Sequence, residues 1–168
     1  MGKLTRVLRH RWQDETDTRR ALDEAALARL QARVAGSERR HSGEIRISVE
    51  AGLPLSYLWR DATARERAVT LFGKLRVWDT EHNNGVLIYL LLADRVIEIV
   101  ADRGVARVVP QTHWQTLVEG MRTAFRAGRF EEGLAQAVDA VDAVLATHYP
   151  LAAGQVNPNE LSDSADLR

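Results

Sequence analysis

One pair of neighbouring segments restricts the fold of this chain more than any other feature. Residues 86–92 are almost entirely apolar and favour strands, which is typical of a central strand covered on both faces. The short connection Ala93-Asp94-Arg95 leads into a second strand-forming segment, residues 96–101. The two segments therefore predict an antiparallel hairpin whose first strand lies in the interior of a sheet.

A third strand is expected earlier in the chain. From Glu44 to Glu50 apolar and polar residues alternate, as in a strand with one buried face. A helix opens between this strand and the hairpin, where Thr63 and Glu66 have the spacing of a capping box. A strand–helix–strand crossover makes the first two strands parallel. The predicted fold class is α/β, a small mixed β-sheet with a parallel crossover and an antiparallel hairpin, sandwiched by helices.

Other segments complete the expected organisation. Helical periodicity extends over about residues 17–40 and 130–149, and a second capping pattern, Thr112 to Gln115, opens a helix that Gly128 ends. Tyr57, Leu58 and Trp59 are expected to contact the core from a loop. We divide the chain into a basic amphipathic segment (1–16), a single α/β domain (17–150) and a flexible C-terminal tail (151–168).

Composition removes several classes of protein. The chain has 23 basic and 23 acidic residues, so the overall positive charge of a nucleic-acid-binding protein is missing and no nucleic-acid partner is expected. There is no cysteine, which excludes disulfides, thiolate metal sites and thiol nucleophiles. No apolar run reaches the length of a spanning helix, and no secretory signal follows Met1. We expect a cytoplasmic protein, with contact to a membrane surface left open.

The first twelve residues carry four basic side chains and no acid. Leu4, Val7, Leu8 and Trp12 recur at helical spacing, with the basic residues mostly on the other side. Two interpretations remain open: a short helix that binds an anionic membrane surface, or an apolar stripe that packs on the domain. The residues expected to bind a membrane in the first case are Lys3, Arg6, Arg9, Arg11 and Trp12.

The predicted topology brings the starts of strands one and two and the end of strand three to one end of the sheet. Carboxylate and amide groups gather there, and oxygen ligands suit Ca²⁺ or Mg²⁺ better than zinc. The candidate metal ligands are Glu44, Asn83, Asn84 and Asp102. Arg103 is a candidate phosphate-binding residue, because its planar guanidinium matches a phosphate. The alternative is a rim of solvated polar turns in which Arg103 pairs with a carboxylate.

The remaining patterns carry less chemistry. The five histidines lack the spacing of a local zinc motif, and no G-x-S-x-G elbow, Walker loop or G-x-G-x-x-G is present. Glu98 alternates between apolar neighbours on the third strand and is expected to pair with Arg46 across the sheet.

Four segments in this order are similar to those of a known family. They are S-G-E-I at 42–45, N-N-G-V-L-I-Y-L-L-L-A-D-R at 83–95, I-E-I-V-A-D-R-G at 97–104 and F-R-A-G-R-F-E-E-G-L at 125–134. Together they resemble the TPM domain family, also called the TPM phosphatase family, over about residues 20–150.

The resemblance implies a mixed α/β sandwich, divalent-metal binding in some members, a phosphatase activity reported for thylakoid relatives, and roles as accessory subunits of membrane complexes. Asn83 stands where many relatives have Asp, which removes one charge from the metal end. Many relatives also have a signal peptide and an anchor, which we do not expect here. Our first hypothesis is a binding or accessory module that acts with a protein or membrane-associated partner. The alternatives are a metal-dependent phosphatase of low activity, and a structural domain that works as an oligomer.

Overall fold

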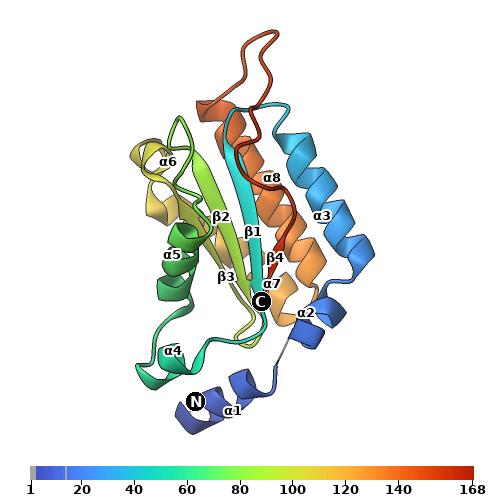
Figure 1. Ribbon diagram of the computed structural model, residues 1–168, viewed down its shortest axis with the longest axis vertical. Coiled ribbons are helices and arrows are strands. Elements are labelled where there is room, and N and C mark those ends of the chain that lie inside the picture. The colour runs from blue at the N-terminus through green and yellow to red at the C-terminus, as the bar shows by residue number, and fades with distance from the viewer. Residues whose placement is uncertain (1–2, 14) are drawn as a thin grey trace.

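Four strands form one mixed sheet in the computed structural model (Figure 1). They are β1 (Glu44–Glu50), β2 (Gly85–Leu91), β3 (Val96–Ala101) and β4 (Asp166–Leu167), in the order β3-β2-β1-β4. β1 and β2 run parallel and β2 and β3 antiparallel, which confirms the predicted crossover and hairpin. The structure describes the backbone of residues 3–13 and 15–168 and the side chains of residues 5–13 and 16–168.

Helices cover both faces of this sheet, as the predicted α/β sandwich requires. In chain order the helices are α1 (Lys3–Arg11), α2 (Glu15–Ala21), α3 (Glu24–Ser37), α4 (Leu55–Trp59), α5 (Ala64–Lys74), α6 (Arg103–Val108), α7 (Gln111–Arg126) and α8 (Phe130–His148). None of these helices, in the part of the chain that the structure describes, has the length and apolarity needed to cross a membrane.

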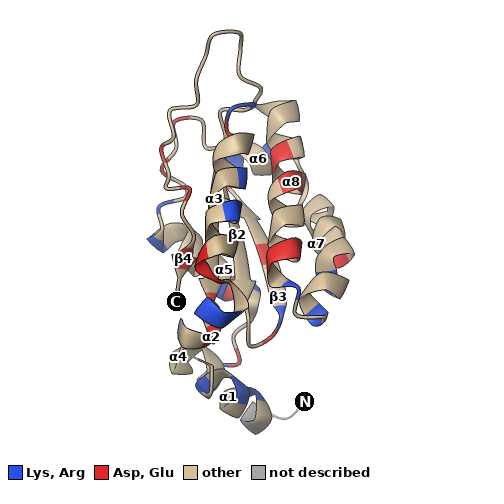
Figure 2. Ribbon diagram, turned by 90° about the vertical axis from the view of Figure 1, so that its right-hand side faces the viewer, with Lys and Arg blue, Asp and Glu red and all other residues tan. Residues whose placement is uncertain are grey.

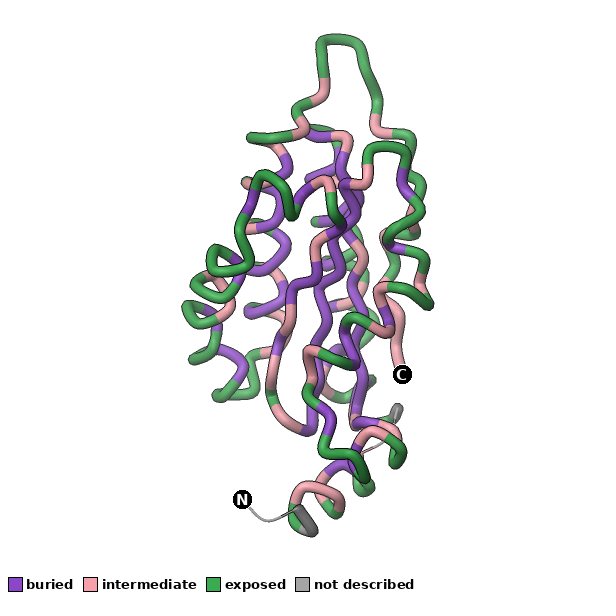
Figure 3. Tube along the Cα trace, turned by 90° about the vertical axis from the view of Figure 1, so that its left-hand side faces the viewer, coloured by how far each residue is buried: buried purple, intermediate pink, exposed green. Residues whose placement is uncertain are grey.

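Each face of the sheet has its own apolar core. Successive side chains of β2 point alternately into the two cores. Ile88 belongs to the core with α3, α7 and α8, whereas Leu87 belongs to the core with α4 and α5. Every residue of β2 is buried, as its uninterrupted apolar sequence predicts (Figure 3). Because both faces are covered, the positions left for polar chemistry are the two ends of the sheet.

The observed helices agree with prediction in part. The helix expected over 17–40 divides at Asp23, whose side chain caps α3 by accepting from the Ala26 N–H at 2.7 Å. The capping box of Thr63 and Glu66 is confirmed. The second capping pattern is wrong, because α7 already begins at Gln111 and has no side-chain cap.

Residues 54–60 also depart from the expected loop. They contain the short helix α4, in which Leu58 is buried but Trp59 points outward. The expectation that Trp59 lies against the core is therefore wrong. A five-residue helix has room for only one inward-facing stripe, and Leu58 occupies it.

Residues 151–168, expected to be a flexible tail, form a protruding exposed loop and then return along β1 to end as β4 (Figures 1 and 3). The Arg168 N–H donates to the carbonyl of Val49 at 2.9 Å. Arg46 donates to the carbonyls of Ser162 and Ser164, so its predicted pairing with Glu98 is wrong. Glu98 lies 3.6 Å from the Arg65 guanidinium instead. The contacts of the C-terminal segment with Val49 and Arg46 satisfy polar groups that the edge of β1 would otherwise leave to water.

Ion pairs fix the position of α3 against α8. Arginines in or just after α3 face acids of α8, and blue and red bands of the two helices accordingly lie side by side in Figure 2. The pairs are Arg29 with Glu131, Arg33 with Asp139, and Arg40 with Asp142. The first two pairs are exposed and contribute little stability individually, whereas the carboxylate of Asp142 in the third pair is buried.

Candidate functional site at the strand starts

The register of the strands brings the predicted site residues to one end of the sheet. Glu44 pairs with Gly85, and the Asp102 N–H donates to the Gly85 carbonyl at 2.9 Å. The Glu44 N–H lies 3.4 Å from the carbonyl of Asn84. Glu44, Asn84 and Asp102 thus belong to three adjacent strand ends, as the topology predicted.

Gly85 keeps the two carboxylates of this row apart. Adjacent strands lie roughly 4.8 Å from each other, so Glu44 and Asp102 start roughly 10 Å apart on either side of Gly85. A side chain at Gly85 is excluded, because a Cβ there would lie 2.0 Å from the carbonyl oxygen of Val77. Within the described residues, no group of three or more His, Cys, Asp or Glu is arranged to hold a metal ion.

Glu44 is fully buried at the start of β1. Its Oε2 accepts a hydrogen bond from the Leu161 N–H at 3.1 Å, whereas Oε1 has no hydrogen-bond partner. Burial raises the pKa of this carboxyl above its ordinary value, and the neighbouring acids Glu160 and Asp163 add to the shift. One oxygen of Glu44 therefore holds the tail, and the other is left as a buried acceptor.

Two further oxygens at this end are buried acceptors without a donor. The Asn84 side-chain nitrogen donates to the Ser42 carbonyl at 3.0 Å, which leaves Asn84 Oδ1 unpaired. Asp102 Oδ1 accepts from the Arg103 N–H at 2.6 Å and caps α6, which leaves Asp102 Oδ2 unpaired. The three oxygens have the donor chemistry of a Ca²⁺ or Mg²⁺ site, although the ligands are spread along the sheet edge.

Asn83 and Arg103 form the outer part of this end. Asn83 has a left-handed backbone (φ 53°) in the turn before β2. Its side-chain oxygen accepts from Arg103 Nε at 2.7 Å. The exposed guanidinium of Arg103 is thus held beside the turn by an amide rather than by the carboxylate that the alternative interpretation required.

Glu38 is a member of this end that the sequence did not single out. It lies directly after α3, is 4% exposed, and its Oε1 accepts from the Ile45 N–H at 3.3 Å. Burial, the charge of Glu44 and the nearby Asp163 raise its pKa to about 8. A hollow of about 300 Å³ adjoins it, lined by Glu38, Asn157, Asp163 and Val156 among others. A glutamate that directly follows an amphipathic helix is usually exposed. No local sequence pattern therefore indicates this cluster, which depends on the contact of Glu38 with the C-terminal segment.

The basic N-terminal residues lie at the opposite end of the sheet. Arg6 and Arg9 pair with Asp94 in the turn between β2 and β3, so neither is free for a membrane in this arrangement. Arg11 and Trp12 are exposed. Lys3, the remaining candidate, has its side chain outside the described residues.

The comparisons with known proteins agree with this architecture. The TPM domain family matches residues 16–144, which is most of the chain. The comparison with curated proteins finds no match. Among solved structures, the BA42 protein from the psychrophilic bacterium Bizionia argentinensis is similar with a TM-score of 0.75 and 25% identity, over 88% of this chain and 95% of that one.

A second solved structure shares the fold. It is the N-terminal domain of a protein from P. gingivalis, with a TM-score of 0.63 and 23% identity, over 76% of this chain and 80% of that domain. The family match over residues 16–144 and the shared fold agree with the resemblance found in the sequence. The chain belongs to the TPM domain family.

Proposed function

We propose that this TPM domain is a binding module, which takes a divalent cation weakly at its strand starts and serves a membrane-associated partner as an accessory subunit. The observation that carries the cation part is the set of three buried, unpaired oxygens on Glu44, Asn84 and Asp102. A buried acceptor without a donor is unfavourable, and a hard cation is one group that would satisfy several such oxygens at once. Asn83 in place of a carboxylate makes the expected affinity low.

A binding role is also supported by the hydroxyl groups nearest this end. Thr80 Oγ1 accepts from the Asn84 N–H at 3.1 Å, and Ser42 Oγ accepts from the Asn84 side chain at 3.3 Å. Both hydroxyls orient Asn84, so neither is poised as a nucleophile beside a general base. The polar groups of this end are thus better suited to hold a ligand than to attack one.

The test is a titration of metal-free protein with Ca²⁺ and with Mg²⁺, followed by amide NMR shifts. Saturable shifts at residues 42–44, 79–85 and 102–104 are expected, with dissociation constants on the order of millimolar. The variant Asp102→Asn retains an N-cap for α6 but loses one charge, so it should weaken binding several-fold. Asp139→Asn, which removes an exposed carboxylate of α8 paired with Arg33, is the matched control and should leave binding unchanged. Flat titrations for both cations would refute the proposal.

A metal-dependent phosphatase of low activity is the second candidate. One observation favours it: the exposed Arg103 guanidinium, held by Asn83 next to Asp102, is available to a phosphate. A cation on Asp102 would then polarise a phosphoryl oxygen. Turnover of p-nitrophenyl phosphate that requires the metal and is lost in both Asp102→Asn and Arg103→Gln would support it. Turnover that survives Asp102→Asn would contradict this assignment.

A further inference from the structure

The edge of β1 is covered by a segment from far along the chain, residues 161–168, which ends in the two-residue strand β4 (Figure 1). We call these residues the resident segment. The Arg168 N–H donates to the Val49 carbonyl at 2.9 Å, and the Ala51 N–H donates to the Arg168 carbonyl at 2.8 Å. Without the resident segment, β1 would be an edge strand with free N–H and C=O groups, to which an extended chain can add as a further strand.

Most side-chain contacts of β1 with the resident segment reach its main chain. The Arg46 guanidinium donates to the carbonyls of Ser162 and Ser164. Glu44 Oε2 accepts from the Leu161 N–H at 3.1 Å. None of these three contacts depends on a side chain of the bound segment, so another extended chain can make them.

Two positions of the resident segment are recognised by their side chains. Asp166 lies opposite Ser48, whose hydroxyl donates to Asp166 Oδ2 at 2.9 Å. Leu167 lies opposite Val49 and packs against the core formed with α3, α7 and α8. The edge of β1 therefore accepts a carboxylate at one position and an apolar side chain at the next.

The resident segment buries little of its own surface. None of residues 151–168, all of which the structure describes, is fully buried, whereas all but one residue of β1 are. Residues 151–160, which connect the segment to α8, form the protruding and mostly exposed loop seen in Figure 3. Elements that bury few side chains open locally at a low free-energy cost, so the segment is suited to exchange with another chain.

Like charges also oppose closure of the resident segment. Glu38 and Glu44 are buried in the domain, and Asp163 of the segment raises the pKa of both carboxyls. Glu160, directly before the segment, adds to the shift at Glu44. β1 contains one cation, Arg46, to balance these acids. The segment is therefore held against a partly unfavourable electrostatic environment.

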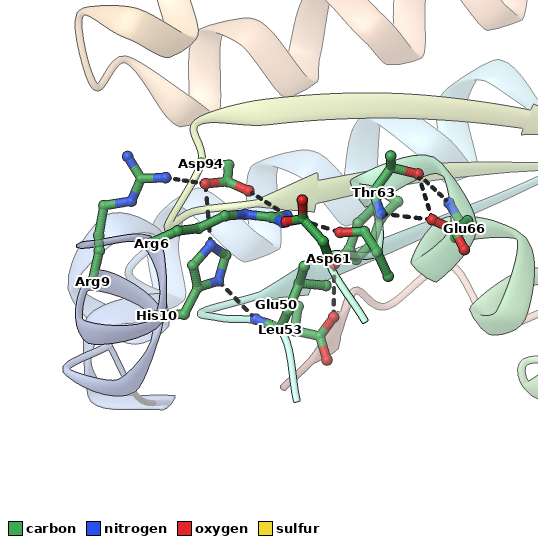
Figure 4. A network of polar contacts seen from close by, with 11 residues as sticks. Arg6, Arg9, His10, Glu50, Leu53, Asp61, Thr63, Glu66 and Asp94 are labelled. Carbon is green, nitrogen blue, oxygen red and sulfur yellow. Dashed lines mark hydrogen bonds and ion pairs between the residues drawn. The ribbon is translucent and has the colours of Figure 1, made fainter. Parts of the chain in front are cut away.

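Helix α1 is held differently. Arg6, Arg9 and His10 contact the carboxylate of Asp94, and the other ring nitrogen of His10 accepts from the Leu53 N–H at 3.0 Å (Figure 4). Groups of opposite charge thus attach α1 to the turn between β2 and β3. Of these two attached elements, the resident segment is the one that a competing chain can replace.

From these contacts we propose that the edge of β1 between Arg46 and Ala51 is a docking site for an extended segment of a partner protein, which displaces the resident segment and pairs parallel to β1. The partner segment carries an acidic residue opposite Ser48 and an apolar residue directly after it. The proposal rests on the proposed function for the existence of a protein partner, and it names the surface and the chemistry of that contact. The resident segment acts as an intramolecular competitor that covers the edge until the partner binds.

The experiment measures binding of a fluorescein-labelled peptide with the sequence of residues 161–168 to the full chain, by fluorescence anisotropy with EDTA present. The double variant Asp166→Ala/Leu167→Ala weakens the resident segment and leaves β1 unchanged. It should bind the peptide at least about tenfold more tightly than wild type, because its edge is covered for a smaller fraction of the time. A peptide with the same two substitutions is the control probe and should bind at least about tenfold more weakly than the native peptide. Circular dichroism checks that the variant is folded.

A second set of variants locates the peptide on β1. Ser48→Ala, made in the double variant, removes the hydroxyl that donates to the carboxylate and should weaken peptide binding several-fold. Ser56→Ala, which changes an exposed serine of α4, is the matched control and should leave peptide binding unchanged. In the double variant, added peptide should move the amide NMR shifts of Val49 and Ala51 toward their wild-type positions.

No saturable binding of the peptide by the double variant would overturn the proposal. Equal binding by the double variant and wild type, or equal binding of the native and control peptides, would overturn it as well. A wild-type dimer in light scattering that the peptide dissociates would instead assign the edge to the resident segment of a second copy. Because EDTA is present, failure of the cation titration leaves the peptide result unaffected, and failure of peptide binding leaves the cation part of the proposed function standing.

Discussion

The buried carboxyl of Glu38 makes the strongest quantitative prediction. Glu38 is almost completely buried between the end of α3, the start of β1 and the C-terminal segment. Burial and the acids Glu44 and Asp163 raise its pKa from 4.5 to about 8. The group is therefore uncharged in the folded protein at neutral pH, while it is ionised in the unfolded chain.

The sign of the effect on stability follows from these two pKa values. Below pH 4.5 Glu38 is protonated in both states, so it contributes no pH dependence. Between pH 4.5 and about 8 the unfolded chain releases the proton and the folded protein retains it, so the free energy of unfolding falls as pH rises. Each pH unit of the gap corresponds to about 1.36 kcal/mol. The whole gap therefore lowers stability by up to about 5 kcal/mol at pH 9.

The variant Glu38→Gln removes this ionisation and keeps an oxygen that accepts from the Ile45 N–H. We expect it to be several kcal/mol more stable than wild type at pH 9 and close to wild type at pH 4.5, which amounts to roughly 2–4 °C in Tm per kcal/mol. Urea unfolding followed by circular dichroism at both pH values measures the difference. Comparing variant with wild type isolates Glu38 from Glu44 and Glu98, whose pKa values burial also raises.

Glu24→Gln is the matched control on the same helix, because Glu24 is exposed in the first turn of α3. It should change stability by less than about 1 kcal/mol, and by the same amount at both pH values. A Glu38→Gln protein whose stability follows the wild-type pH profile would refute the reasoning. So would an NMR titration that finds the Glu38 carboxyl ionising near its ordinary value.

Two further predictions concern charges that the fold depends on. Arg67 donates three hydrogen bonds to the buried Glu50, so Arg67→Met should lower the free energy of unfolding in urea by about 3–5 kcal/mol. Arg129→Met, which removes an exposed ion pair, should lower it by less than about 1 kcal/mol. Equal effects of the two variants would contradict the argument from burial. Asp94→Asn removes the charge that Arg6, Arg9 and His10 contact, so it should weaken the docking of α1. Limited trypsin digestion should then cleave after Arg9 and Arg11 several-fold faster than in wild type. An unchanged cleavage rate would show that these contacts of Asp94 contribute little to the docking of the helix.

The strands were predictable because their signal is local. The alternating segment Glu44–Glu50 and the segment Val96–Ala101 match β1 and β3 residue for residue, and the apolar run before the hairpin matches β2 within one residue. Helix α6 was missed because Asp102-Arg103-Gly104, with its glycine, resembles a turn that ends the strand. Gly104 is needed because a Cβ at this position would lie 2.4 Å from the Asn83 carbonyl. Strand β4 was missed because two residues carry no periodicity.

The site was predictable in position but not in detail. Topology alone places Glu44, Asn84 and Asp102 at one end of the sheet, and the register confirms it. The separation of Glu44 from Asp102 depends on the intervening Gly85, and the burial of Glu38 depends on a tail segment far along the chain. Such contacts join residues whose local sequence is unremarkable, so no pattern within one segment reports them.

Helix α1 shows why an amphipathic pattern does not by itself identify the buried face. Its pattern favoured two outcomes, binding of the basic residues and Trp12 to an anionic membrane surface, or packing of the apolar stripe on the domain. In the described residues, Arg6, Arg9 and His10 contact Asp94 instead, and Leu8 and the following Trp12 are exposed. A partly buried carboxylate that contacts two guanidinium groups and an imidazole stabilises the docked helix more than a single exposed ion pair would. Electrostatics therefore determines how this helix docks, and the apolar side chains of Leu8 and Trp12 stay exposed.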